Sequence, residues 1–169
     1  KMTRTKLLVI IIVAVPLGIF TLIGLDFFAL NSLQFYLNPY NAKVDVLDLS
    51  MDVSVSICNP TFMPTSFNKF ITHVYYKSTK LGEFTLWGSD IPSYRSKDLT
   101  GRFKFDESAM LKFFLSSLTG QKLPDSNFSE YSMYLKLEKS ILGFIPYNYE
   151  KQISFDEFGQ MMRSKGFNC

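Results

Sequence analysis

The sequence predicts a mainly β protein in which a single N-terminal transmembrane helix precedes a β-sandwich with one crossing helix. Two observations support this prediction. Residues 7–25 form an apolar run without a charge, and the chain beyond them contains short alternating segments with turn signals about every ten residues. We therefore divide the chain into a basic stub and transmembrane helix (1–28), a juxtamembrane neck (29–42), a sandwich (43–155) and a C-terminal tail (156–169).

The apolar run is long enough to span a bilayer. Its 19 residues would reach about 28 Å as a helix, close to the hydrocarbon thickness of a membrane. Three basic residues precede it (Lys1, Arg4 and Lys6), and Asp26 follows it. The positive-inside rule then places the N-terminus in the cytoplasm and the C-terminal domain outside the cell membrane. A cleaved signal peptide remains the alternative, although the run is longer than a usual signal core and no Ala-x-Ala-like site follows it.

Residues within and just after this helix indicate what it contacts in the membrane. Residues 26–42 are rich in aromatic side chains of the kind that line a membrane interface. Ala14 and Gly18 form a small-xxx-small pair that permits close approach of another helix, although packing against lipid alone is compatible with it. We expect the lipid bilayer and other membrane proteins as partners.

Alternating apolar and polar residues predict the strands. Residues 49–57 alternate strictly and end at Asn59-Pro60, where a strand must stop because proline lacks a backbone donor. The other predicted strands are 67–77 and 82–87, which form a hairpin, then 99–105, with Gly101 at a possible bulge, and finally 131–139 and 147–155.

Helical spacing appears once within the sandwich, at residues 106–118. Asp106 or Ser108 can cap its start, and its apolar residues recur on one face, which predicts a helix that crosses the domain. The tail can form a last short helix from residue 156.

The order of these motifs resembles the LEA14-like family, also known as late embryogenesis abundant type 2 or WHy domains. The resemblance rests on MDVSVSICNP, on ITHVYYKSTKLGEFTLWGSDIP and on YLKLEKSILGFIPYNYEKQISF, which together span residues 43–155. It implies an immunoglobulin-like or fibronectin-III-like sandwich of seven strands with one helix, no enzymatic activity, and an association with stress tolerance. Membrane-anchored members occur in plants and archaea, and the residue bias of this chain favours an archaeal source.

Composition and chemistry exclude several functions. Residues 27–169 carry 15 basic and 14 acidic residues, which argues against nucleic-acid binding because that requires a concentrated basic surface. His73 is the only histidine, and a structural role is expected for it. Neither a nucleophile–base pair nor a metal cluster can be assembled. We expect no enzyme, no cofactor or metal, and identify no small-molecule substrate.

Two kinds of covalent modification are open. Cys58 and Cys169 can form a disulfide outside the cell, with Cys58 on the polar face of its strand, or they can remain independent thiols. Asn127 begins an Asn-Phe-Ser sequon in a polar loop and is a possible glycosylation site.

Two loops are unusually apolar, with Phe62 and Met63 in one and Phe144 and Ile145 in the other. These side chains either plug the ends of the sandwich or contact a partner or the membrane. The leading functional hypothesis is a non-catalytic single-pass membrane protein that presents its domain for protein or envelope binding or stress protection. The alternative is an accessory structural subunit of a multi-subunit membrane enzyme or other membrane complex.

Overall fold

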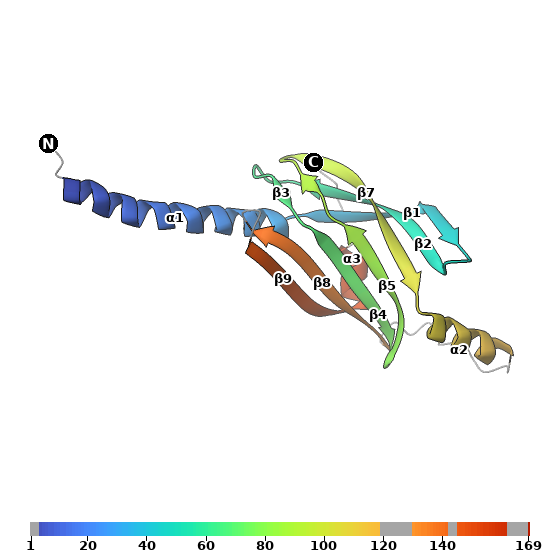
Figure 1. Ribbon diagram of the computed structural model, residues 1–169. Helices are drawn as coiled ribbons and strands as arrows, with labels where there is room; N and C mark the ends of the chain where they lie inside the picture. Colours follow the sequence, from blue (N-terminus) through green and yellow to red (C-terminus); the bar gives the residue numbers. More distant parts are fainter. Residues whose placement is uncertain (1–3, 119–129, 142–144, 162–168) are drawn as a thin grey trace.

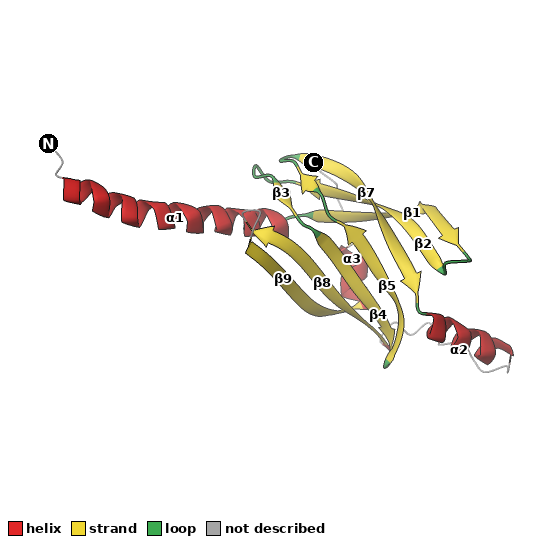
Figure 2. Ribbon diagram, viewed as in Figure 1, coloured by secondary structure: helices red, strands yellow, loops and turns green. Residues whose placement is uncertain are grey.

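The computed structural model is mainly β, with a long N-terminal apolar helix (Figures 1 and 2). It describes residues 4–118, 130–141, 145–161 and 169. The elements in chain order are α1 (Arg4–Asn31), β1 (Gln34–Asp45), β2 (Ser50–Asn59), β3 (Thr65–Ser66), β4 (Lys69–Tyr76), β5 (Thr79–Trp87), β6 (Asp90–Ile91), β7 (Arg95–Phe105), α2 (Glu107–Leu118), β8 (Tyr131–Ile141), β9 (Ile145–Ser154) and α3 (Phe155–Met161).

Seven strands form one antiparallel sheet in the order β1-β2-β7-β5-β4-β8-β9, and β3 pairs with β6 in a small second sheet. The large sheet curls (Figure 1), and the ring of Phe35 on β1 consequently stacks on that of Phe70 on β4, with centroids 5.9 Å apart. The predicted sandwich, in which two separate sheets pack face to face, is not confirmed. The reason is β7, which pairs with β2 along one edge and with β5 along the other and so joins the two halves.

The concave side of the sheet holds the hydrophobic core. Alternate residues of the central strands point into it, among them Val55, Ile57, Phe70, Leu86 and Met133. Helix α3 packs against this core through Phe155, Phe158 and Met161. The expected short helix is therefore present, but it covers the core and belongs to the domain that was expected to end at residue 155.

Helix α1 lies almost entirely outside this core. It runs unbroken through Pro16 and extends from one end of the sheet (Figure 1). Residues Ile12–Asn31 are long and apolar enough to cross a membrane. Most side chains described between residues 12 and 22 are exposed, as in Leu17 at 65% and Phe20 at 73%.

The segment expected to be a neck contains the last three residues of α1 and most of β1. Strand β1 pairs with β2 through residues 34–38 and 43–45, and the register shifts between Asn38 and Lys43. Pro39 sits at this irregularity, and β1 is an edge strand, where proline is tolerated. The sheet thus begins nearer the helix than the predicted boundary at residue 43.

Helix α2 does not cross the domain. It starts where β7 ends and points away from the sheet (Figure 2). Asp106 caps it as predicted, since its Oδ1 accepts the backbone N–H groups of Ser108 and Ala109 at 3.0 and 3.1 Å. Ala109 is buried, whereas Leu111 is 59% exposed, because only the first turn reaches the sheet.

Gly101 is not a bulge, since β7 pairs with β2 in unbroken register around it. It is glycine because the ring of Phe84 lies where a side chain would be: a Cβ on Gly101 would come within 2.3 Å of that ring. The glycine lets the curled sheet close on Phe84.

The substitution Gly101→Ala is expected to lower the free energy of unfolding by about 1–3 kcal/mol, because the buried ring of Phe84 would have to shift to admit the added methyl group. Gly159→Ala on α3 is the matched control, since its Cβ would meet nothing described within 4 Å. Thermal unfolding of the full chain in detergent, followed by circular dichroism, measures both. Equal unfolding temperatures for the two variants would contradict this explanation of Gly101.

Candidate functional site at the helix–sheet junction

The most strongly constrained polar group lies where α1 meets the sheet. The Lys139 ammonium on β8 donates to Asp26 Oδ1 on α1 at 2.6 Å and to Thr65 Oγ1 on β3 at 3.0 Å. Thr65 Oγ1 in turn donates to the same Asp26 oxygen at 3.1 Å. The Lys139 side chain is only 2% exposed and that of Asp26 25% exposed. Three elements far apart in sequence are thus joined by one buried charge pair.

Apolar contacts complete this junction. The ring of Phe27 meets that of Tyr147 on β9 edge-on, with centroids 4.8 Å apart. Ala29 and Leu30 at the end of α1 and Leu33 just after it are buried, and the two leucines belong to the core cluster. The last turns of α1 are therefore built into the domain, and the helix cannot pivot freely about a flexible linker.

Next to the junction, Asn59 organises two loops. Its side chain is fully buried, and it donates to the Met63 carbonyl at 2.8 Å and to the Ile91 carbonyl at 3.3 Å. Its Oδ1 accepts the backbone N–H and the hydroxyl of Thr61 at 3.0 and 2.7 Å. The Asn-Pro motif of the sequence thus locks the loop after β2 onto β6.

A disulfide joins Cys58 to Cys169, whose Cα atoms are 5.8 Å apart. Cys58 is fully buried, although alternation placed it on the polar face. The bridge fixes the C-terminal residue beside the end of β2, on the same side of the domain as the junction.

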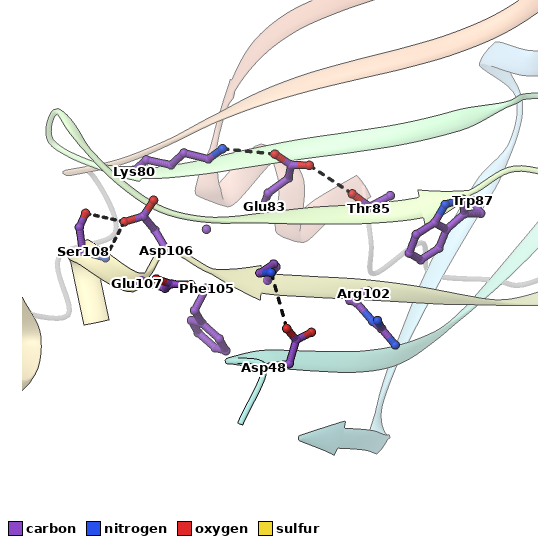
Figure 3. Close-up of a pocket in the computed structure, with 12 residues that line it drawn as sticks. Asp48, Lys80, Glu83, Thr85, Trp87, Arg102, Phe105, Asp106, Glu107 and Ser108 are labelled. Atoms are coloured by element: carbon purple, nitrogen blue, oxygen red, sulfur yellow. Dashed lines mark hydrogen bonds and ion pairs between the residues drawn. The ribbon is translucent and has the colours of Figure 1, made fainter. Parts of the chain in front are cut away.

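A groove of about 720 Å³ runs over the outer face of β5 and β7 (Figure 3). Its charged side chains bind one another: Lys104 lies 3.6 Å from Asp48, and Lys80 lies 3.2 Å from Glu83. Trp87 lies at one end of the groove and is 53% exposed.

The electrostatics of the groove favour fixed charges. Arg102 binds Asp52 through two hydrogen bonds, of 2.7 and 3.1 Å, which lower the pKa of the Asp52 carboxyl and raise the pKa of Arg102. Burial raises the pKa of Glu83. The Lys80 hydrogen bond and nearby positive charges together lower it by more, so that the net shift of this pKa is downward. His73 Nδ1 lies 3.1 Å from Glu83. Carboxyls held ionised in this way suit a contact surface better than proton transfer.

The interior has an apolar cavity of about 130 Å³ between the sheet and Phe158 of α3. The Thr72 hydroxyl is buried beside it without a hydrogen-bond partner. In the part of the chain that the structure describes, no group of three or more His, Cys, Asp or Glu side chains is placed to hold a metal ion.

The remaining predicted site residues fall in three places. Ala14 and Gly18 lie on the exposed stretch of α1. Phe62 is 56% exposed, Met63 is half-buried and Ile145 is 41% exposed, all near the junction. Asn127 and Phe144 lie outside the described residues.

The pairing of Asp26 with Lys139 was not predicted from the sequence, although the position of Lys139 on its strand indicates a buried partner. Lys139 has the same parity on its strand as Met133, Leu135 and Leu137, which face the core. A lysine on an apolar face requires a buried counter-charge.

Comparisons with known proteins find loose similarities of fold. No family model matches the sequence, and no curated protein matches it. A protein from Archaeoglobus fulgidus is 10% identical, with a TM-score of 0.40, over 73% of this chain and 94% of that one. A FixG-related protein from Vibrio parahaemolyticus is 11% identical, with a TM-score of 0.33, over 72% and 93%. The solution structure of a protein described as late embryogenesis abundant is 15% identical, with a TM-score of 0.30, over 82% and 83%.

Replacing Lys139 by methionine is expected to destabilise the full chain by about 3–5 kcal/mol, because the Asp26 carboxylate then loses its buried counter-charge. Lys136→Met is the control: it lies on the same strand, is one-third exposed and pairs with Glu138 at the surface, so its loss is expected to cost less than about 1 kcal/mol. Denaturant unfolding in detergent measures both. An equal effect of the two substitutions would show that the junction contributes no more than a surface pair.

Proposed function

We propose that this chain is a non-catalytic single-pass membrane protein. Helix α1 spans the cell membrane with its N-terminus in the cytoplasm, and the sheet domain is presented outside for protein or envelope binding or stress protection. The observation that supports this best is the contrast along α1, in which the described residues 12–22 mostly expose apolar side chains while the last turns are buried in the domain.

The exposed part of α1 is apolar on every side. Ile12, Val13, Val15, Leu17 and Phe20 are each more than half exposed, and they point in different directions around the helix. A surface helix of a soluble domain has one polar face, whereas a helix that is apolar all round requires an apolar environment. Lipid supplies that environment along the whole length of the span.

The buried end of α1 favours a retained anchor over a cleaved signal peptide. The helix continues past the apolar run to Asn31 without a break, and Asp26 on it is the counter-charge for Lys139. A retained helix holds this carboxylate in place through its own backbone hydrogen bonds.

Two further observations support the orientation. The basic residues lie before the apolar run, as expected for a cytoplasmic N-terminus. The Cys58–Cys169 disulfide lies in the domain beyond the helix, and disulfides persist mainly in oxidising compartments.

We also propose that the domain belongs to the LEA14-like group and that its curled sheet is a variant of the immunoglobulin-like or fibronectin-III-like sandwich. The support is the order of the sequence motifs and the structural role of one of them, the Asn-Pro pair, whose Asn59 links two loops. Stress protection is proposed on this resemblance, and an archaeal source on the residue bias of the chain.

A second candidate function, an accessory subunit of a membrane complex, is favoured by the opposite end of the domain. The turn between β1 and β2 exposes Val46 at 75% and Leu47 at 99%, and Leu111 on α2 is 59% exposed. Apolar side chains that are this exposed suit burial against another protein.

The topology is tested by cysteine labelling of intact cells. The native cysteines are joined in a disulfide, so a single added cysteine reports its own side of the membrane. A membrane-impermeant maleimide is expected to label Thr100→Cys, on the exposed face of β7, in intact cells. It should label Thr3→Cys only after permeabilisation. The reverse pattern would overturn the orientation, and loss of the protein from the membrane fraction after alkaline washing would overturn the anchor.

Gentle detergent extraction followed by native gel electrophoresis separates the two candidate functions. A free-standing protein is expected to migrate near the mass of the monomer with its detergent. An accessory subunit would co-purify stoichiometrically with other membrane proteins, and Leu47→Asp should then disrupt that complex because it places a charge at the exposed apolar turn. Ser54→Asp on the outer face of β2 is the control, since Ser54 is not at that turn.

A further inference from the structure

We propose that the end of the domain adjoining α1 lies directly on the bilayer surface and inserts Phe62, Trp87 and Tyr94 into the lipid headgroup region. This inference rests on the proposed membrane insertion of α1 and goes beyond it, because a single-pass anchor does not require its domain to touch lipid. These three residues form the membrane-facing surface.

The chain path places these residues beside the helix. Phe62 is three residues before Thr65, whose hydroxyl contacts Asp26 on α1. Tyr94 donates its backbone N–H to the Thr61 carbonyl at 3.1 Å and so lies against the same loop. Trp87 pairs across the sheet with Lys69, which in turn pairs with Glu138, the neighbour of Lys139. In Figure 1 this end of the sheet faces the helix.

All three side chains of the membrane-facing surface are exposed. Phe62 is 56%, Trp87 53% and Tyr94 61% exposed. An aromatic ring that is exposed to water does not gain the stabilisation that burial would give it. At a membrane interface the apolar ring contacts acyl chains, and the polar atoms of tryptophan and tyrosine contact the headgroups.

The surface is held rigidly, and at some cost in backbone energy. Tyr94 has a φ of 53°, a left-handed conformation that is unfavourable for a bulky residue and that needs support from its surroundings. The hydrogen bond to Thr61 and the buried Asn59 network supply that support. The position of the exposed Tyr94 ring is therefore fixed by the loops beside the junction.

The junction fixes the direction in which the surface points. The ion pair between Asp26 and Lys139 and the ring contact of Phe27 with Tyr147 tie the helix to the sheet at two places. A bilayer that contains α1 up to residue 25 must therefore end beside Asp26, at the level of the loop that carries Phe62. The turn between β1 and β2, which contains Leu47, is at the end of the domain away from α1 (Figure 1).

Fluorescence quenching by lipid tests this arrangement, since Trp87 is the only tryptophan of the chain. The full chain is reconstituted into phosphatidylcholine vesicles, with and without phosphatidylcholine brominated on its acyl chains. Further single-tryptophan proteins carry Trp87→Phe together with one of Phe62→Trp, Tyr94→Trp, Phe20→Trp or Leu47→Trp. Phe20→Trp reports insertion of α1, and Leu47→Trp is the matched exposed control at the far end.

Brominated lipid is expected to quench the native Trp87 and the tryptophans at 62 and 94 by roughly twofold, because rings in the headgroup region lie next to the upper acyl chains, and to leave the tryptophan at 47 nearly unchanged. Quenching at position 20 with no more quenching at 62, 87 and 94 than at 47 would overturn the membrane-facing surface alone. Absence of quenching at position 20 would overturn the membrane anchor as well. The native Trp87 needs no substitution, so the test does not depend on a variant that folds poorly.

Discussion

A lysine ammonium cannot be buried without a counter-charge, and this constraint determines how the chain is assembled. Lys139 lies on the inward face of β8, and the carboxylate that neutralises it comes from α1, 113 residues earlier in the sequence. Because Thr65 completes the same contact, the loop before β3 is fixed as well. The position of the helix relative to the sheet, the start of β1 and the placement of the adjoining loops all follow from that pair.

The curled sheet depends on its own close contacts. Gly101 admits the ring of Phe84, and a Cβ on Gly82 would come within 2.5 Å of the Lys104 carbonyl and 2.7 Å of the Phe103 ring, so neighbouring strands approach where a side chain would hold them apart. The curl brings Phe35 over Phe70, and α3 covers the remaining concave surface. The hydrophobic core is therefore enclosed by one bent sheet and a short helix. In a sandwich, two stacked sheets would enclose it.

Patterns of local spacing predicted much of this fold. Alternation identified β2 and β8, because each has one buried and one solvated face. The β4–β5 hairpin was identified by β-branched and aromatic residues on both sides of a short polar link. Strand β1 escaped because Pro39 and the irregularity beside it disturb the alternation. Helical spacing identified α2 but could not specify its neighbour, since an apolar face does not indicate which surface it will meet. Alternation likewise says nothing about ladder order, which is why the joining role of β7 was not predicted. The junction was not predicted for a related reason. Asp26 was noted as a single acidic residue after an apolar run, but local patterns cannot identify a partner that lies 113 residues further along the chain.

The disulfide has a topological consequence. Cys58 and Cys169 are 111 residues apart, so every strand from β3 to β9 lies within a covalent ring. A protease that cuts the ring at one point opens it without releasing a fragment, because both pieces stay attached through the sulfur atoms. Cys58 is in turn linked through β2 and β1 to α1. A once-nicked domain would therefore remain tethered to the helix, and two cuts within the ring, or one cut with reduction of the bridge, are required before any part can be lost.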